Sequence, residues 1–300
     1  MGKRGAVFYI GRVNKIGFDA NRFIEALFAP IPLDDKKSNC IWNIVNVGKE
    51  DDTNCSYYFG KLNKANPNAK VIVMTKNYTE EMEKEEPDMV LCSSEFVYIP
   101  QYSGIVFRSI PSYIEPKRFV SVFDRIIENT LGNFFVDCQI NLLDDLDSFF
   151  KRLNSFSAFS TVKVTVNPPN PLYGRFWKSL KEYLKKRNAT ELQIKETNEN
   201  YNLKTLIQEL IKVLLKNDKN EIEQFLKLND ISLLDAAILM SLDGYGNARI
   251  DGQVNGQHAF IKTHEKMMHF SLEQGFTTKE IFAKANEVFQ RINNERHMEH

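Results

Sequence analysis

Residues 160–195 read STVKVTVNPPNPLYGRFWKSLKEYLKKRNATELQIK and contain the clearest local pattern of the chain. Polar and apolar residues alternate over 161–166, as they do in a half-buried strand. Three prolines within 167–171 then end the ladder, because each lacks a backbone N–H donor. Apolar residues follow at four-residue spacing along one face of a predicted helix, namely Leu172, Phe176, Leu180 and Leu184. Alternation resumes over 191–195, so the stretch predicts a strand, a helix and a second strand.

The two strands of this unit can be arranged in two ways. If they pair in parallel, the helix is a right-handed crossover between them. If a strand from elsewhere in the chain separates them, the unit is a split version of the same motif. Both arrangements make the unit the centre of a carboxy-terminal domain.

The chain before this unit is rich in short strands. Period-two or continuous apolar runs predict strands at 6–13, 42–47, 56–62, 71–74, 95–99, 104–108 and 134–142. Amphipathic spacing predicts helices at 19–28, 116–129 and 144–153. The strands between 42 and 74 suggest an antiparallel meander. The acidic run 79–88 predicts a solvated surface helix or loop, with a partner-binding patch as the alternative.

Helical patterns dominate after Asn198, interrupted by one glycine-rich segment. Asn255-Gly256 in that segment is a strong signal for a two-residue hairpin turn. The last helix has Thr277 and Glu280 at capping-box spacing at its start. With a boundary placed in the Ser/Phe-rich segment 154–160, we predict an α+β protein of two domains. These are a strand-rich domain at 1–156 and an α+β domain at 157–300 that holds the basic helix and the terminal helices.

Composition predicts a folded protein with no net charge. The 300 residues are 43% hydrophobic and 26% charged, and 39 basic residues balance 39 acidic ones. Any attraction to a polyanion must therefore come from local clustering of charge. The four cysteines form no C-x-x-C pair, so neither a zinc module nor a disulfide framework is indicated. Because no window resembles a signal h-region or a membrane span, we expect a cytoplasmic location without direct membrane insertion.

The predicted helix of the 160–195 unit carries the densest positive charge in the chain. Between Tyr173 and Asn188 there are six positive charges and one negative charge, from Glu182. Clustered cations bind phosphates because each neutralised phosphate releases counterions. Aromatic side chains among them can stack on unpaired bases. The predicted nucleic-acid-binding residues are Arg175, Trp177, Lys178, Lys181, Lys185, Lys186 and Arg187. The alternative is a solvated face that balances the acidic 79–88 run or meets an acidic partner protein.

Other candidate sites are weaker. The glycines around 244–252 do not follow a strand and open a helix, as a phosphate loop requires, and so predict turns. Asp137, Glu191 and Lys195 fit a metal-dependent nuclease poorly, because Gln193 occupies the usual acidic position. The spacing of His258, His264 and His269 does not favour a metal site, and no nucleophile motif is present. We therefore predict no catalytic residue, no metal and no cofactor.

The order of parts resembles a group of prophage- and defence-encoded proteins, which includes the Rex exclusion sensor of lambdoid phages and the B component of Kiwa-type defence. The shared features are the Phe-Gly-Lys-Leu strand at 59–62, a hairpin near 95–108, S-T-V-K-V at 160–164 with its helix and second strand, and a late hairpin at 246–262. This resemblance implies an antiviral protein that binds DNA and signals to a partner, often a membrane component. The helices after Asn198 are longer here than in that group.

Three functions follow as hypotheses. The first is a non-enzymatic DNA-binding component of a phage exclusion or defence system, expected to form a homo-oligomer. The second is a metal-dependent nuclease or another defence effector enzyme. The third is a protein-interaction subunit whose basic helix meets an acidic partner.

Overall fold

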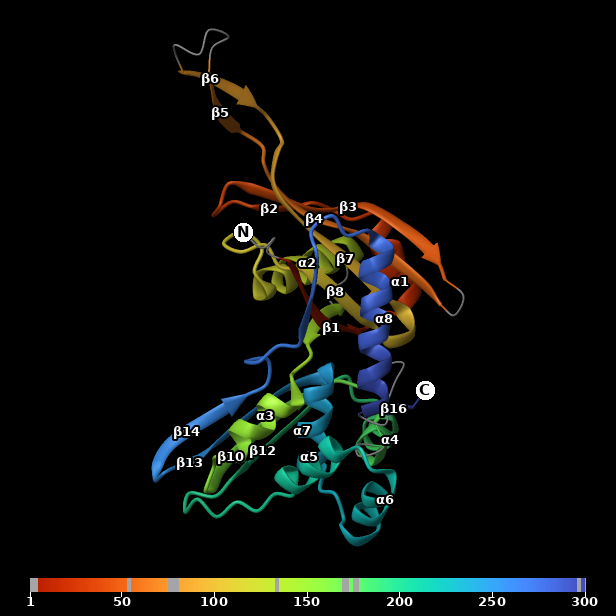
Figure 1. The fold of residues 1–300 in the computed structure, drawn as a ribbon, viewed down its shortest axis with the longest axis vertical. Helices are drawn as coiled ribbons and strands as arrows, with labels where there is room; N and C mark the ends of the chain where they lie inside the picture. Colours follow the sequence, from red (N-terminus) through yellow and green to blue (C-terminus); the bar gives the residue numbers. More distant parts are fainter. Residues whose placement is uncertain are drawn as a thin grey trace.

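Figure 1 shows a computed structural model of the chain, which describes residues 5–52, 55–74, 81–132, 135–168, 173–174, 178–295 and 298–299. Two antiparallel sheets organise the chain; the first has a hydrophobic core on each of its faces, and the second has a core on one face. Strands dominate the amino-terminal part, and helices and strands mix in the remainder. The predicted α+β class is confirmed.

Eight strands form the first sheet. They are β1 (Ala6–Ile16), β2 (Leu33–Asp35), β3 (Cys40–Asp51), β4 (Ser56–Asn66), β7 (Met89–Ile99), β8 (Gly104–Arg108), β9 (Asp137–Leu142) and β15 (His269–Leu272). Their order is β15-β1-β8-β7-β4-β3-β2, and β9 pairs with the second half of β1. The consecutive strands β2, β3 and β4 are neighbours in space. The predicted meander of strands at 42–47, 56–62 and 71–74 is confirmed for its first pair only, because residues 71–74 belong to a separate two-stranded sheet. The turn Pro100–Tyr102 joins β7 to β8.

Helices cover both faces of the first sheet. On one face α1 (Ala20–Phe28) and α2 (Pro116–Leu131) pack against Phe96 and Tyr98 of β7. On the other face α8 (Thr278–Glu295) packs against Val97 and Ile99 of the same strand. Successive side chains of a strand point to opposite faces, so β7 contributes to both cores.

The second sheet consists of four antiparallel strands. These are β10 (Ala158–Val166), β12 (Leu192–Thr197), β13 (Gly246–Val254) and β14 (Gln257–Lys262), in the order β12-β10-β13-β14. Val162, Val164 and Val166 of β10 are buried in one core with side chains of five helices. The helices are α3 (Leu146–Leu153), α4 (Lys178–Arg187), α5 (Ile207–Lys216), α6 (Lys219–Leu228) and α7 (Leu233–Met240). The opposite face of this sheet is polar.

The pairing of β10 with β12 differs from both predicted arrangements. The two strands are antiparallel neighbours, and Val166 at the end of β10 lies opposite Leu192 at the start of β12. The connection that contains α4 therefore leaves and re-enters the sheet at the same end. A parallel pair requires a crossover that carries the chain back along the whole strand. No strand separates β10 from β12, so the split motif is wrong as well.

The acidic run also differs from its prediction. Residues Glu81–Glu86 form a strand, β6, which pairs with β5 (Ala69–Met74) over its whole length. The predicted helix or loop is wrong there because the Val-Ile-Val segment of β5 favours an extended ribbon and offers β6 a full set of backbone partners. Figure 1 shows this two-stranded arm reaching well beyond the first sheet. Short strands β11 (Tyr173–Gly174) and β16 (Met298–Glu299) form a second separate pair.

The end of the chain returns to the first sheet. Phe270 of β15 lies opposite Phe8 of β1, and their rings stack at 5.4 Å between centroids. Thr277 and Glu280 form the predicted capping box at the start of α8, since each backbone N–H donates to the other side chain. The proposed division placed residues 157–300 together, whereas β15 pairs within the first sheet and α8 packs on it. An amphipathic pattern shows that a helix is buried on one face but not against which sheet.

Arg12 of β1 joins the two halves of the molecule. Its side chain is 0% exposed, and its Nε donates to the carbonyl of Asp243 at 2.9 Å. Asp243 lies in the turn Ser241–Tyr245 between α7 and β13, which belongs to the second half. Nη1 of Arg12 donates to the carbonyl of Tyr102, and Nη2 lies 3.4 Å from Asn293 of α8. One guanidinium thus contacts both sheets and the terminal helix.

Neighbouring contacts reinforce this joint. The side-chain amide of Asn14 donates to the carbonyl of Gly244 at 3.0 Å. Gly244 has a φ of 84°, and a Cβ there would lie 3.0 Å from Leu143 and 3.2 Å from Arg12. A side chain at this position would therefore be strained and would crowd the arginine. Gly244 thus makes a close backbone contact between the two halves at the end of the π-helical segment Ser241–Tyr245, whereas Gly246 and Gly252 lie in β13 and not in the predicted turns.

Replacing Arg12 with leucine should destabilise the fold by roughly 3–5 kcal/mol, because the buried carbonyls of Tyr102 and Asp243 would lose their donor. Urea unfolding measures this change. Arg22→Leu on the exposed side of α1 serves as the matched control and should change stability by less than about 0.5 kcal/mol. Equal stabilities of the two variants would contradict the role given to Arg12.

Candidate functional site

Helix α4 presents the predicted basic face to solvent. Leu180 and Leu184 are 0% exposed and anchor the helix in the second core. The cations of the outer face that the structure describes are Lys178, Lys181, Lys185, Lys186 and Arg187, and all are exposed except the partly buried Lys181. The predicted residues Arg175 and Trp177, like Leu172 and Phe176, lie outside the described residues.

Burial and a neighbouring ammonium group both disfavour the charged form of Lys181 on α4. The pKa of Lys181 is lowered, mainly because partial burial disfavours its charged form and also because the Lys185 ammonium is close. The Arg187 guanidinium lies 5.6 Å from the centre of the Tyr183 ring, over its face. Tyr183 remains 37% exposed. The helix thus offers a positively charged surface with one accessible aromatic ring.

A second positively charged surface crosses the polar face of the four-stranded sheet. Lys163 of β10 lies directly opposite Lys195 of β12 on one side and Arg249 of β13 on the other. Arg249 in turn lies opposite Lys262 of β14. Directly opposite residues in antiparallel strands point to the same face. The sheet therefore carries one unbroken row of four cations, Lys195, Lys163, Arg249 and Lys262, which we call the cationic row.

This arrangement is unfavourable for the folded chain alone. Like charges directly opposite one another destabilise a sheet, and neighbouring strands are only about 4.8 Å apart. Among the described residues, Arg249 is the only member of the row with an ion-pair partner. It forms a bidentate contact with the carboxylate of Asp251, at 2.6 and 2.8 Å. Hydrogen bonds from Arg249 lower the pKa of Asp251. Three lysine ammonium groups remain available to an anionic ligand.

An aromatic ring lies beside the cationic row. Phe260 of β14 is 41% exposed, and the Arg249 guanidinium lies 4.4 Å from its ring centre. The Lys262 ammonium lies 5.2 Å from the same ring. The flanking positions on this face carry the carboxylate of Asp251, which Arg249 binds, and otherwise hydroxyl and amide groups, from Thr161, Thr165, Thr197, Gln193 and Asn247. Cations, one ring and hydrogen-bonding side chains on an open sheet are the groups that a single nucleic-acid strand requires.

Sequence reasoning missed the cationic row. Each of its members is an isolated lysine or arginine in a different strand, and Lys195 entered only the nuclease hypothesis. The usable signal was the alternation in TVKVTV and ELQIK, which places lysine on the polar face of each strand. Register alone decides that these positions lie opposite one another and opposite Arg249.

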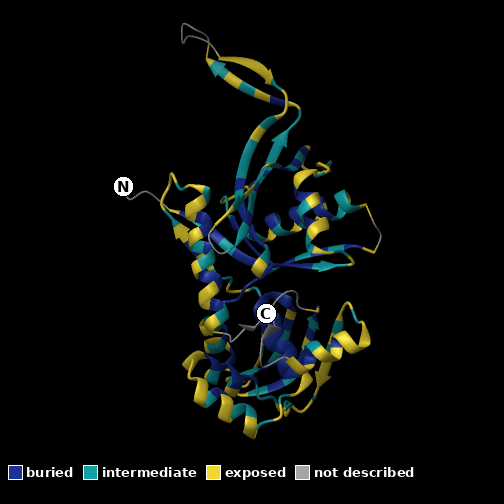
Figure 2. Ribbon diagram, turned by 90° about the vertical axis from the view of Figure 1, so that its right-hand side faces the viewer, coloured by how far each residue is buried: buried dark blue, intermediate teal, exposed yellow. Residues whose placement is uncertain are grey.

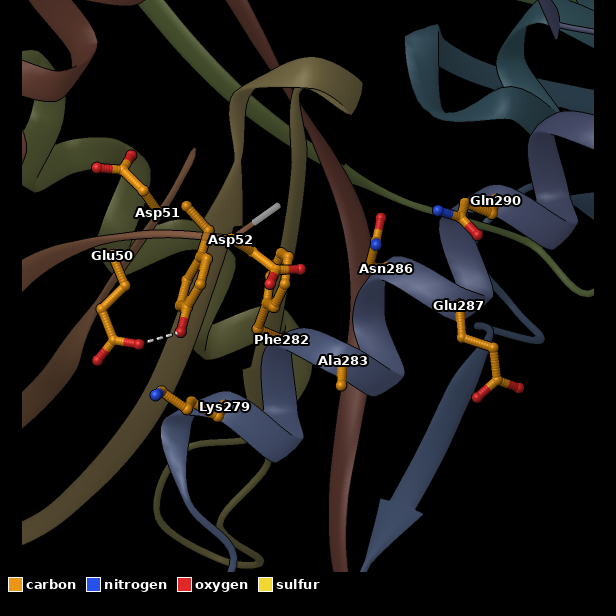
Figure 3. Close-up of a pocket in the computed structure, with 10 residues that line it drawn as sticks. Glu50, Asp51, Asp52, Lys279, Phe282, Ala283, Asn286, Glu287 and Gln290 are labelled. Carbon is orange, nitrogen blue, oxygen red and sulfur yellow. Dashed lines mark hydrogen bonds between the residues drawn. The ribbon is translucent and has the colours of Figure 1, made fainter. Parts of the chain in front are cut away.

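A cavity beside the first sheet has the opposite charge. Figure 3 shows its lining, where the acidic end of the β3–β4 hairpin faces α8 across a space of about 590 Å³. The Tyr57 hydroxyl donates to Glu50, and the Tyr57 ring stacks on Phe282 at 4.0 Å between centroids. Burial and the contact with Glu50 raise the pKa of Tyr57. Glu50, Asp51 and Asp52 at one end of the cavity repel phosphates, so it is unsuited to nucleic acid.

The residues considered for catalysis are not assembled. Asp137 lies in the first sheet, whereas Glu191 and Lys195 lie at the second. Each of the three histidines contacts a separate neighbour, since His258 lies 3.5 Å from Asp251, His264 contacts Asp144 and His269 contacts the Met267 carbonyl. Within the described residues no group of His, Cys, Asp and Glu side chains could hold a metal ion.

One lysine–serine pair has the geometry of a catalytic dyad but lacks access. Lys15 Nζ lies 2.7 Å from Ser103 Oγ, and burial lowers the pKa of Lys15 to about 8. Ser103 is only 2% exposed, in the tight turn between β7 and β8. A substrate could not reach its hydroxyl without opening that turn. The pair therefore stabilises the turn, where the lysine also donates to the Val13 carbonyl at 3.1 Å.

Burial of Lys15 predicts a pH dependence of stability. Its pKa is about 8 in the folded chain, below the ordinary 10.5, so the unfolded chain binds more protons between these values. The free energy of unfolding should rise with pH over that window relative to Lys15→Met. Urea unfolding of both proteins at pH 7.5 and pH 10 measures the difference, and a pH-independent difference would contradict the assigned pKa.

The cationic row predicts a stabilising substitution. Lys163 lies between two other cations, so Lys163→Gln should raise the free energy of unfolding by roughly 0.2–1 kcal/mol at low salt. The gain should shrink at 1 M salt, where the screening length is about 3 Å. Thermal unfolding at both salt concentrations tests this. Lys212→Gln, exposed on α5, is the control and should show neither effect.

No curated protein matches the sequence. A family model described as a domain of unknown function, DUF4747, matches residues 23–206. The matched region begins in α1 and ends after β12, so it contains most of the first sheet, the basic helix α4, and Lys163 and Lys195 of the cationic row. Arg249 and Lys262 lie beyond it. With well over half of its length covered by this match, the chain belongs to the DUF4747 family.

Proposed function

We propose that this protein is a non-enzymatic DNA-binding protein that holds a single strand across the polar face of its second sheet. The observation that carries the proposal is the cationic row, Lys195, Lys163, Arg249 and Lys262, lying directly opposite one another over four strands. A ligand that neutralises these cations removes their mutual repulsion and thereby stabilises the folded chain. Phosphates do so and release counterions at the same time.

The chemistry of the face suggests how the strand lies. Phosphate groups follow the row, where successive cations are about 4.8 Å apart. A base stacks on the exposed part of the Phe260 ring, whose negative charge density Arg249 already balances. Thr161, Thr165 and Gln193 supply hydrogen-bonding groups of either polarity along the phosphate path. Such contacts favour single strands with little dependence on base sequence.

Helix α4 provides an additional phosphate contact in this proposal. Its leucines face the core that the sheet covers, so its cations lie in the helical layer and not on the sheet face. A nucleic acid long enough to leave the cationic row at the β12 edge could continue toward α4. Short oligonucleotides should therefore depend on the row, and longer ones on both surfaces.

A place in phage exclusion or defence is part of the proposal and rests on the sequence resemblance. In that setting the protein signals to a partner, for which a membrane component is the candidate. No helix in the described part of the chain is long and apolar enough to cross a membrane. In this proposal the protein binds DNA in the cytoplasm and relies on a separate membrane component for signalling.

The separate position of α4 favours one second function, a protein-interaction subunit. Five described cations lie there with Glu182 as the opposing charge within the helix, a surface that an acidic protein could also bind. Co-purification of the protein with an acidic partner, free of nucleic acid, would support this alternative. The separation of Asp137 from Glu191 and Lys195 does not support a nuclease site, because these residues lie at different sheets.

The double variant Lys163→Glu/Lys195→Glu should weaken binding to a fluorescently labelled 12-nucleotide single strand by at least about tenfold at 50 mM salt. The slope of log affinity against log salt should fall by roughly 1.4, because two phosphate contacts are lost. Phe260→Ala should cost about 1–3 kcal/mol of binding free energy with an unchanged slope. Fluorescence anisotropy over a salt series measures all three quantities.

Lys212→Glu/Lys227→Glu is the matched control, since it reverses the same number of exposed charges on α5 and α6. If it weakens binding as much as the row variant, net charge and not the row controls affinity. Affinity that does not fall with salt would exclude phosphate binding. Lys178→Glu/Lys181→Glu/Lys185→Glu tests α4 with longer strands, and incubation with plasmid and Mg²⁺ or Mn²⁺ tests cleavage, which is not expected.

A further inference from the structure

The arm formed by β5 and β6 has two unlike outer edges. The sheet that contains them has only these two strands, so the outer edge of each is unpaired. Five of the six residues of β6 are charged, in the sequence EMEKEE. Five of the six residues of β5 are apolar, in the sequence AKVIVM. Charged edge strands resist pairing with other chains, whereas an apolar, β-branched edge promotes it.

Three of the thirteen large apolar side chains that are exposed in the described part of the chain lie on this short arm. Ile72 is 68% exposed, Met74 is 58% exposed and Met82 is 55% exposed. Figure 2 shows most of the arm as exposed or partly exposed, with a buried position at its base, which is Ala69 of β5. An isolated two-stranded ribbon is marginally stable in water, and at least three strands are usually needed for stability. The arm thus lacks a strand along β5.

We propose that a second copy of this chain supplies that strand, so that two β5 strands pair antiparallel about a two-fold axis. In a register centred on Ile72, it lies opposite Ile72 of the partner subunit, and Val71 lies opposite Val73 of the partner subunit. Pairs of β-branched residues at such positions contribute roughly 0.2–1 kcal/mol each. The product is a four-stranded ribbon in which both formerly open β5 edges are paired.

The charges of the arm favour pairing through β5 over pairing through β6. Lys70, the one charged residue of β5, is already bound to Glu83 of β6 at 3.1 Å. Pairing through β5 leaves the two acidic β6 strands on the outer edges, three strand spacings or about 14 Å apart. That separation exceeds the screening length of about 8 Å at physiological salt. Pairing through β6 would instead place acidic strands side by side.

The position of the arm permits this contact without collision. β5 continues β4 beyond Asn66, where β4 pairs with Met89 of β7, and β6 leads back into β7. Figure 1 shows the arm projecting away from both sheets and from α4. Two bodies would therefore lie at opposite ends of the shared ribbon. The cationic row of each copy would stay open, so the dimer goes beyond the proposed DNA binding and does not depend on it.

The test is the oligomeric state of the full-length chain in analytical ultracentrifugation over a concentration series. We expect a dimer that dissociates on dilution, and Ile72→Lys should raise the dissociation constant at least tenfold. Because Ile72 is 68% exposed, this change should leave the melting temperature of the monomer unaltered. Glu85→Gln on β6 changes the net charge equally and should leave the dimer intact.

A chain that is monomeric up to 100 µM would overturn the proposal. A dimer with the same dissociation constant in wild type and in Ile72→Lys would overturn it as well, because the contact would then lie elsewhere. Circular dichroism of Ile72→Lys excludes misfolding as the cause of a lost dimer. Lys70→Glu is a second test of the interface. This change breaks the ion pair with Glu83 and adds negative charge at the proposed contact between the two β5 strands.

Discussion

The buried guanidinium of Arg12 is the contact on which the arrangement of the two halves depends. It extends from β1, the strand next to the edge strands β15 and β9, and reaches the segment before β13, the turn before β8 and helix α8. A buried cation is stable only when its donors are satisfied, and three elements from distant parts of the sequence meet to do this. Gly244 lies close to Arg12 at this meeting point. The positions of the two sheets are therefore coupled through one side chain.

Backbone contacts complete this coupling. The chain passes from the first half to the second near Leu143 and returns near Met268, and these two crossings bind each other, since the Met268 N–H donates to the Leu143 carbonyl at 2.8 Å. Ile10 of β1 donates to the Met268 carbonyl, and Leu143 donates to the Ile10 carbonyl. Both crossings are thus tied to the strand that carries Arg12. The two halves form a single connected unit at this strand.

Both surfaces proposed for function contain a local arrangement that destabilises the isolated folded chain. The cationic row sets like charges opposite one another, and the β5 edge leaves apolar side chains and backbone groups in water. Bound phosphates would remove the charge repulsion, and a partner strand would cover the β5 edge. The acidic cavity beside Tyr57 differs, because Glu50 and Asp51 already contact groups of the same chain, the Tyr57 and Ser56 hydroxyls. A satisfied site of this kind indicates no ligand.

The sequence by itself determined the class of the fold, most strands and helices, the capping box at Thr277 and the Asn255-Gly256 turn, because these depend on short-range periodicity and backbone preference. It also identified the basic face of α4, since four-residue spacing is visible along one helix. Only the tertiary structure decided the antiparallel pairing of β10 with β12, the return of α8 to the first sheet and the strand at 81–86. The cationic row belongs with these, because residues as distant as Lys163 and Arg249 become neighbours only through strand register, which no local pattern specifies.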